Sequence, residues 1–206
     1  IFTQSLNDSR NGPSVTIAQE SITAIASDFN YMGASIGAAE GEAFLFAAQN
    51  SISNKQPLLV VATGGGMKMQ ESIISLNQMT RTTLAINELK KNNLPYIVCI
   101  TDPTAGGITA SYAMLGDIQI AEPGAEIIFA GRRVIESTIK EELPENFQTA
   151  EHTMKCGFVD TIIARKDLPE KIGTLLSILL NKNSEVNSTS ENETSKNTQQ
   201  LSKVAS

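Results

Sequence analysis

Residues 57–71 read PLLVVATGGGMKMQE, and residues 96–111 read YIVCITDPTAGGITAS. In each stretch a short apolar run is followed at once by a glycine turn and a helical pattern. A continuous apolar run of this length is typical of a strand that is buried on both faces of a parallel sheet. Ligands of open α/β sheets bind beyond the carboxyl ends of such strands, where both turns lie.

The same alternation of apolar runs and helical patterns continues outward from these two stretches. Strands are expected at residues 21–29, 57–63, 96–101, 118–121 and 126–129, and helices at 41–53, 69–92, 108–115, 134–143 and 149–157. This spacing indicates βαβ units and a largely parallel sheet. The expected domain spans residues 21–180. Residues 1–20 are interpreted as the N-terminal remnant of a longer chain, and the polar residues 181–206 are expected to be disordered.

Composition excludes several classes of function. The chain has 206 residues, a net charge of −6 and a pI of about 4.9, so it lacks the basic surplus that nucleic acid requires. No apolar run approaches the ~18 residues that a membrane-spanning helix needs. The two cysteines, Cys99 and Cys156, are far apart and predict neither a disulfide nor a metal site.

The two glycine turns are the strongest candidates for chemistry. Glycine lets a ligand approach the backbone closely, and the first N–H groups of a helix point outward without an internal partner. Two such turns side by side could direct two N–H groups at one oxygen, an oxyanion hole suited to the enolate of a thioester. The alternative is that these glycines serve only as tight turns. Nucleotide motifs are absent, because residues 64–71 contain neither a Walker P-loop nor a GxGxxG fingerprint.

A competing motif is GASIG at residues 33–37, which matches the GxSxG elbow of serine hydrolases. Ser35 would be the nucleophile, and Asp102 or Asp117 followed by His152 would complete the triad. The match is weak, because His152 lies inside a helical pattern and no strand rich in β-branched residues precedes Ser35. His152 is instead expected to be a helix surface or packing residue.

A longer series of motifs identifies a family. The matching segments are residues 31–37, 65–66, 69–71, 94–96, 101–107, 113–117, 120–123, 129–131, 133–136, 143–144 and 147–148. Through this ordered series, residues 21–163 resemble the beta subunit of the bacterial-type acetyl-CoA carboxylase carboxyltransferase. The resemblance treats the GxSxG match as a turn in which Ser35 has no nucleophilic role.

The resemblance implies a crotonase-like α/β fold built from ββα units. It implies a carboxyltransferase that is active with its alpha subunit in an α2β2 assembly and that makes malonyl-CoA from acetyl-CoA for fatty acid biosynthesis. The carboxyl group would come from biotin on a separate carboxyl carrier protein, after an ATP-binding biotin carboxylase has loaded it. The implied location is the cytoplasm, or an organelle of bacterial origin.

The resemblance also implies roles for the backbone of the two turns. The N–H groups of Met67, Gly106 and Gly107 would be the oxyanion donors, and Gly65 and Gly66 would shape the first turn. Because the base would come from biotin, such a site needs oriented amides more than a side-chain base.

Three cations, Lys68, Arg132 and Arg133, are candidates for contacting CoA phosphates or the partner subunit, with solvated surface charge as the alternative. The chain departs from the family's usual Ala-Arg at Met67 and Lys68. The family's four-cysteine zinc ribbon has no counterpart here, so zinc is expected only on a preceding segment. Two other functions stay open, a stand-alone enoyl-CoA hydratase or isomerase and a non-catalytic assembly partner.

Overall fold

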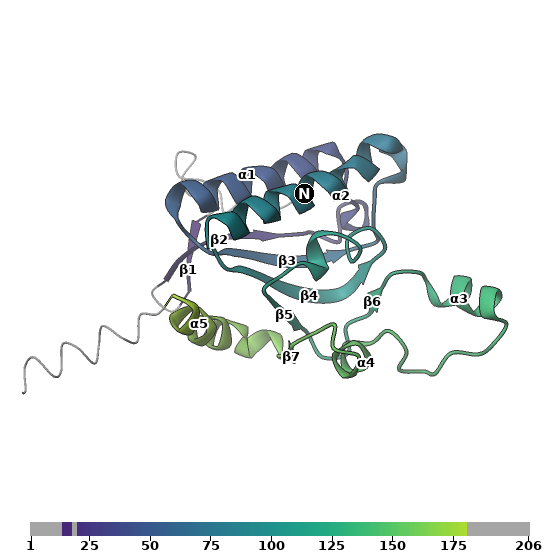
Figure 1. Ribbon diagram of the computed structural model, residues 1–206. Helices are drawn as coiled ribbons and strands as arrows, with labels where there is room; N and C mark the ends of the chain where they lie inside the picture. The colour runs from purple at the N-terminus through teal and green to yellow at the C-terminus, as the bar shows by residue number, and fades with distance from the viewer. Residues whose placement is uncertain (1–13, 18–19, 181–206) are drawn as a thin grey trace, which may run out of the picture.

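The computed structural model describes residues 14–17 and 20–180. A twisted sheet forms the centre, two long helices cover one face, and a C-terminal helix covers part of the other (Figure 1). The strands are β1 (Ser14–Ile17), β2 (Glu20–Ala26), β3 (Leu58–Gly64), β4 (Tyr96–Ala105), β5 (Ile118–Ala121), β6 (Ile127–Ile128) and β7 (Thr161–Ile162). The helices are α1 (Ala38–Asn54), α2 (Ile73–Lys91), α3 (Arg132–Ile139), α4 (Ala150–Lys155) and α5 (Leu168–Leu179).

The seven strands follow the order β1-β2-β3-β4-β5-β7, and β6 pairs with the end of β4. Among the described residues, β1 and β2 form an antiparallel pair, and the other strand pairs are parallel. The described residues also contain four short 3-10 helices: η1 (Met32–Ala34), η2 (Met69–Glu71), η3 (Tyr112–Met114) and η4 (Arg165–Asp167). The largely parallel sheet that the sequence predicts is confirmed.

Apolar residues alternate between the two faces of the sheet, as the two-residue period of a strand requires. Val98 belongs to the larger core under α1 and α2, where it joins Phe44. Its neighbour Ile97 belongs to the smaller core on the other face, with Ile172 of α5. Central strands are therefore buried on both sides, which explains the continuous apolar runs that identified them.

The helix expected at residues 108–115 is wrong. The segment forms tight turns and ends in η3. The Thr109 hydroxyl donates to the Gly106 carbonyl and the Ser111 hydroxyl to the Gly107 carbonyl, and Ser111 has a non-helical backbone (φ −136°, ψ −116°). Hydroxyl side chains that bond to nearby backbone compete with helix formation in this way.

Other differences lie at the ends of the expected elements. The helix predicted from residue 69 starts at Ile73, because Ser72 has a positive φ of 48°. Helix α5 and strand β1 were not predicted, and β1 lies within the expected N-terminal remnant. The division of the chain into remnant, domain and tail stays a prediction, since residues 1–13 and 181–206 lie outside the described residues.

Candidate active site

The two glycine turns meet at one edge of the sheet. Strands β3 and β4 are parallel neighbours with Gly64 opposite Thr104, so both chains leave the sheet at the same edge. A Cβ atom on Gly66 would lie 3.6 Å from the Gly107 nitrogen and 3.6 Å from the Ala105 carbonyl oxygen. The juxtaposition predicted for the turns is therefore present.

Positive φ angles explain why glycine is needed in both turns. Gly66 has φ +121° and Gly106 has φ +60°, a region that side chains with a Cβ rarely adopt. A Cβ on Gly106 would also lie 3.5 Å from the Gly65 carbonyl oxygen. The glycines thus allow the two backbones to come into contact.

The predicted oxyanion donors differ in their availability. Within residues 20–180, neither the Met67 N–H nor the Gly107 N–H donates to a protein acceptor. The Gly106 N–H, by contrast, donates to the Ile128 carbonyl of β6 at 2.9 Å. Two of the three predicted donors are therefore available to a ligand, whereas Gly106 is engaged in the sheet.

A short bridge to the preceding loop sets the direction of the Met67 amide. The Ile36 N–H donates to the Gly66 carbonyl at 2.9 Å, and the Lys68 N–H donates to the Ile36 carbonyl at 2.8 Å. The Gly66 carbonyl and the Met67 N–H belong to one planar trans peptide, in which they point in opposite directions. Because the carbonyl faces Ile36, the Met67 N–H faces away from it.

Strand β6 fixes the second turn, which sequence reasoning did not foresee. The Thr109 hydroxyl oxygen lies 2.8 Å from the carbonyl oxygens of both Gly106 and Ile128, so its one proton is shared between them. The Ser111 hydroxyl donates to the Gly107 carbonyl at 2.6 Å. Hydroxyl residues two and four positions after a glycine pair are the signal that could have indicated this local bonding.

Lys68 is buried beneath the first turn and does not face solvent. Its ammonium nitrogen lies 2.7 Å from Glu40 Oε1 and 3.5 Å from Glu71 Oε1, and 5.7 Å from the centre of the Tyr31 ring. The side chains of Lys68 and Glu40 are only 7% and 5% exposed. This geometry favours an internal positioning role for Lys68 over the predicted contact with a phosphate.

The charges in this cluster are mutually stabilised. Burial opposes ionisation of Glu40, but hydrogen bonds from Lys68 and from the Gly37 N–H outweigh it and lower the pKa of Glu40. Burial likewise disfavours the charged form of Lys68, yet the hydrogen bond and charge of Glu40 outweigh it and raise the pKa of Lys68. Both groups are therefore ionised at neutral pH.

The predicted arginines lie on α3, which projects from the body of the protein in Figure 1, so the structure does not place them against the turns. The Arg132 guanidinium donates to the Leu143 carbonyl at 2.8 Å and closes the loop that follows α3. Arg133 is exposed, and its side chain has no hydrogen-bond or ion-pair partner among the described residues. Of the three predicted cations, Arg133 is thus the one whose charge has no partner among the described residues.

Residues 18–205 match the family described as Carboxyl transferase domain. The chain belongs to the carboxyl transferase domain family. It is 70% identical over 185 residues to the "Acetyl-coenzyme A carboxylase carboxyl transferase subunit beta" of Pelagibacter ubique, covering 90% of this chain and 60% of that protein. It is 53% identical over 161 residues to the protein of the same name from Sinorhizobium medicae, covering 78% of this chain and 53% of that protein. This carboxyl transferase domain thus spans less than two thirds of those relatives.

Solved structures confirm the fold class. The transcarboxylase 12S hexamer with methylmalonyl-coenzyme A aligns with a TM-score of 0.73 at 29% identity, covering 81% of this chain and 32% of that one. The Pseudomonas malonate decarboxylase MdcD-MdcE hetero-dimer aligns with a TM-score of 0.70 at 19% identity, covering 84% and 78%. The carboxyl transferase domain described here therefore has the crotonase-like α/β fold that the sequence predicts.

The serine hydrolase alternative fails on the geometry of this carboxyl transferase domain. The Ser35 hydroxyl donates to the Met32 carbonyl at 2.9 Å. His152 lies on α4, where its only side-chain partners within the described part of the chain are the Phe147 ring and the Cys156 thiol. Asp102 accepts from the backbone N–H of Glu126, and Asp117 accepts from that of Tyr96. Neither carboxylate is bonded to His152 in the described part of the chain, so no triad forms.

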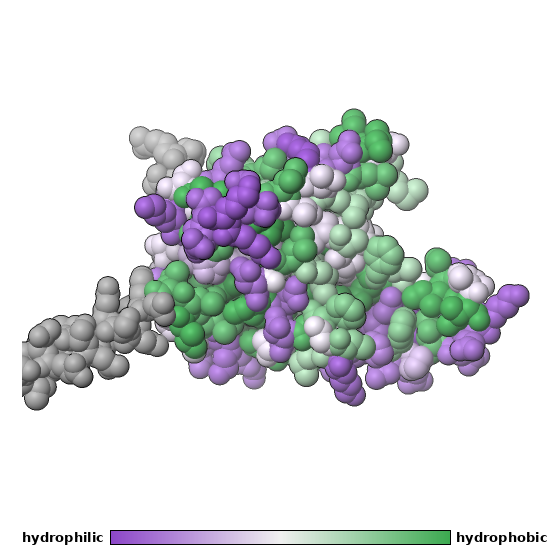
Figure 2. All heavy atoms as spheres, viewed as in Figure 1, coloured by the Kyte–Doolittle hydropathy of each residue, from purple (hydrophilic) through white to green (hydrophobic). Residues whose placement is uncertain are grey.

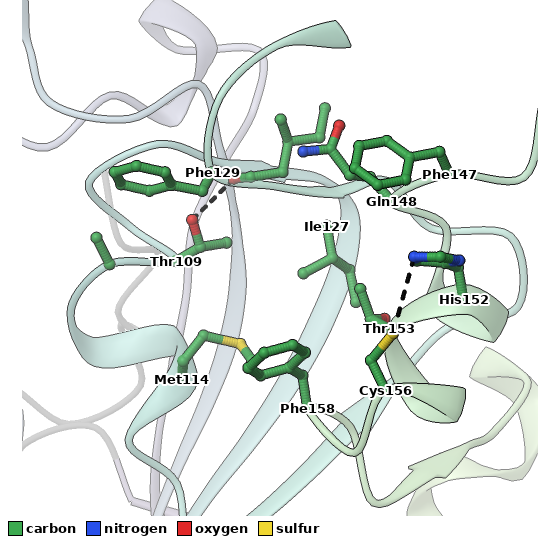
Figure 3. A pocket seen from close by; sticks show the side chains of 12 residues that line it. Thr109, Met114, Ile127, Phe129, Phe147, Gln148, His152, Thr153, Cys156 and Phe158 are labelled. Carbon is green, nitrogen blue, oxygen red and sulfur yellow. Dashed lines mark hydrogen bonds between the residues drawn. The ribbon is translucent and has the colours of Figure 1, made fainter. Parts of the chain in front are cut away.

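An apolar cavity of about 300 Å³ borders the second turn of the carboxyl transferase domain. Figure 3 shows Thr109 on one wall, Met114 and Phe158 below, and opposite them His152 on α4 and Cys156 directly after that helix. The Cys156 sulfur lies 3.8 Å from His152 Nε2. The Thr109 hydroxyl is already bonded to backbone carbonyls, so the cavity presents mainly carbon to a ligand.

Two further features of the carboxyl transferase domain concern metals and membranes. In residues 14–17 and 20–180, no group of three or more His, Cys, Asp or Glu side chains could hold a metal ion. Over the same residues, every helix is too short or too polar to cross a bilayer. Cys99 is buried and Cys156 exposed, and both are free thiols.

Proposed function

We propose that this chain is the catalytic part of the carboxyltransferase beta subunit of acetyl-CoA carboxylase. It transfers the carboxyl group from carboxybiotin to acetyl-CoA, which gives malonyl-CoA for fatty acid biosynthesis. The observation that carries the proposal is the pair of unengaged backbone donors, Met67 N–H and Gly107 N–H, where the two turns meet. The names of the bacterial relatives support the same activity.

The chain's own contribution to this reaction is electrostatic. Removing the α-proton of a thioester puts negative charge on the carbonyl oxygen, and preformed amide donors stabilise that charge without reorganising. Met67 and Gly107 supply the donors, while Gly65, Gly66 and Gly106 let the oxygen approach the backbone. Biotin, when bound, supplies the carboxyl group and accepts the α-proton.

The carboxylates beside the first turn disfavour the hydratase alternative. A hydratase needs a free carboxylate poised over the acyl group to move a proton to or from water. Glu40 is engaged by Lys68 and the Gly37 N–H. Glu71 accepts from the Ala38 N–H at 2.6 Å. Neither side chain is available as a general base.

The proposed partners are the alpha subunit in an α2β2 assembly, the biotin carboxyl carrier protein and biotin carboxylase. Apolar side chains gather on the surface over the start of α2 and over α3 (Figure 2). Met69 is 89% exposed beside the first turn, and Phe129 is 71% exposed beside the second. Exposed apolar patches of this kind mark interaction surfaces, which supports a partner chain next to the site.

Smaller parts of the assignment follow from the same reaction. Arg133 is the proposed contact for a CoA phosphate or for the partner, because its charge is uncompensated. We assign ATP use to biotin carboxylase, since residues 64–71 contain no phosphate-binding loop. Zinc stays with the preceding segment that the family resemblance implies. We place the enzyme in the cytoplasm or in an organelle of bacterial origin.

The test is malonyl-CoA formation from carboxybiotin and acetyl-CoA by the full-length subunit mixed with its alpha partner. Met67→Pro removes the N–H donor, while its ring also fixes φ at residue 67 and restricts Gly66, and it should lower kcat by roughly 100- to 1000-fold. Met67→Ala keeps the N–H and is the matched control, expected to retain most activity. Circular dichroism would verify that both variants fold.

Three results would contradict the proposal. Equal activity of the two Met67 variants would exclude the amide as a donor. Hydration of crotonyl-CoA without carboxyl transfer would favour the hydratase. Binding of the alpha subunit with no turnover would favour a non-catalytic assembly role.

A further inference from the structure

A buried charge cluster joins the first glycine turn to the start of α1, and the proposed reaction does not use it directly. Lys68 leaves the turn and places its ammonium against Glu40 and Glu71. Glu40 Oε2 accepts from the Gly37 N–H at 2.8 Å, and Glu71 Oε2 accepts from the Ala38 N–H at 2.6 Å. Three charged side chains thus bind both the turn and the segment that faces it.

Stability alone does not explain such a cluster. Removing charges from water is costly, and well-packed apolar side chains of similar volume often stabilise a fold equally well. Lys68 and Glu40 are nearly inaccessible to solvent, so neither acts as a solubilising surface charge. A buried ion pair can instead specify one conformation, because few other arrangements satisfy both charges.

The conformation that this cluster specifies includes the Met67 amide. The Ile36 N–H holds the Gly66 carbonyl, which shares a peptide plane with the Met67 N–H. Ile36 is followed by Gly37, and the Gly37 N–H is held by Glu40. A continuous series of contacts therefore links the Lys68 ammonium to the peptide that carries the Met67 N–H, and so fixes the orientation of that N–H.

We propose that Lys68, held by Glu40 and Glu71, is a positioning residue for carboxyl transfer. It keeps the segment 36–38 in place, so that the Met67 N–H stays directed at the thioester oxygen. This inference rests on the proposed function and gives Lys68 a role in turnover, in place of a contact with CoA. Arginine at this position would preserve the positive charge.

The first experiment separates positioning from substrate binding. In the full-length subunit with its alpha partner, Lys68→Met should lower kcat roughly 100-fold, the loss typical of a group misplaced by about 1 Å. KM for acetyl-CoA should stay within about twofold, since substrate contacts are retained. Lys68→Arg should restore most of kcat. The matched control is Lys91→Met, which removes a surface lysine paired with Glu88 at 2.8 Å and should leave both constants unchanged.

The second experiment follows the backbone and does not depend on carboxyl transfer. Amide hydrogen exchange, measured by mass spectrometry on the same proteins, reports the opening of the hydrogen bonds that the Ile36 and Lys68 N–H groups donate. Lys68→Met should raise exchange at these amides roughly tenfold or more, since locally opened segments exchange faster. Exchange in strand β4 should not change, and Lys68→Arg should exchange as the wild type does.

The outcomes are distinguishable from those of the proposed function. A raised KM with unchanged kcat in Lys68→Met overturns positioning and favours substrate contact. Unchanged exchange at Ile36 and Lys68 also overturns it, whether or not the wild type transfers carboxyl groups. A wild type without carboxyl transfer contradicts the proposed function, and the exchange result then decides the role of Lys68 in holding the turn. Loss of kcat with faster exchange, both reversed by arginine, supports the proposal.

Discussion

Replacing Gly107 with alanine should crowd two methionine side chains in the site, Met67 most closely and Met79 less so. The added methyl carbon would lie 2.7 Å from Met67 Cγ, 3.0 Å from Met67 Cε and 3.2 Å from Met79 Sδ. Carbon atoms in contact normally lie about 3.5–4.0 Å apart, so the Met67 side chain would have to withdraw by roughly 0.8 Å. The obstacle is a methionine side chain, whose three rotatable bonds let it move.

The size of the effect follows from this geometry. Overpacking a well-packed site costs about 1–3 kcal/mol, and the flexibility of Met67 places Gly107→Ala near the lower end, at about 1 kcal/mol. Met67→Ala removes both crowded carbons. In the Met67→Ala background, Gly107→Ala should therefore cost little unfolding free energy. The two substitutions should show a favourable coupling energy of about 1 kcal/mol.

The assay is a double-mutant cycle on the free energy of unfolding. Urea denaturation of the wild type, both single variants and the double variant would be followed by circular dichroism. Independent sites add within about 0.3–0.5 kcal/mol. Additivity within that margin would refute the placement of the Met67 side chain over Gly107, and with it the contact between the two turns.

Three further predictions concern buried groups. Burial raises the pKa of Cys99 to about 12, so iodoacetamide at neutral pH should alkylate Cys156 and spare Cys99, as peptide mass mapping would show. The pKa of Glu40 lies below its ordinary value of 4.5. Its contribution to the free energy of unfolding is therefore present above pH 4.5 and is lost as the pH falls through the lowered pKa. In urea titrations at several pH values, Glu40→Gln should reduce the loss of stability that the wild type shows on acidification. The Tyr96 hydroxyl donates to the buried Tyr112 carbonyl at 2.8 Å, so Tyr96→Phe should lower the free energy of unfolding by about 1–2 kcal/mol in urea titrations; no change would contradict that bond.

Strands were predictable from the sequence where burial on both faces leaves a continuous apolar signal. Residues 57–63 and 96–101 were placed correctly because their interior positions are almost all buried. The segment 108–115 was misassigned because an apolar period cannot show that Thr109 and Ser111 bond to nearby carbonyls. Strand β7 was not predicted, because its two residues are too few to carry a period of their own.

The site was predictable in part for a similar reason. Glycine pairs after buried strands indicate where backbone donors gather, so the meeting of the two turns was foreseen. The occupied Gly106 N–H was not, because its acceptor, Ile128, lies on another strand. The burial of Lys68 was not foreseen either, since Glu40 is 28 residues away in the sequence. Tertiary pairing of this kind leaves no local pattern.

The bridge between Ile36 and the first turn makes the number of residues in that turn as important as their identity. Along a chain paired in this way, successive amides alternate between facing the neighbouring strand and facing away from it. The Gly66 carbonyl and the Lys68 N–H, one on each side of Met67 in the sequence, both bond to the backbone of Ile36. Inserting or deleting a single residue ahead of Met67 would invert that alternation, and its N–H would turn inward even if every glycine were retained. The number of residues in this loop, which substitutions do not change, therefore decides which way the Met67 N–H points. Related chains should vary here in composition but not in length.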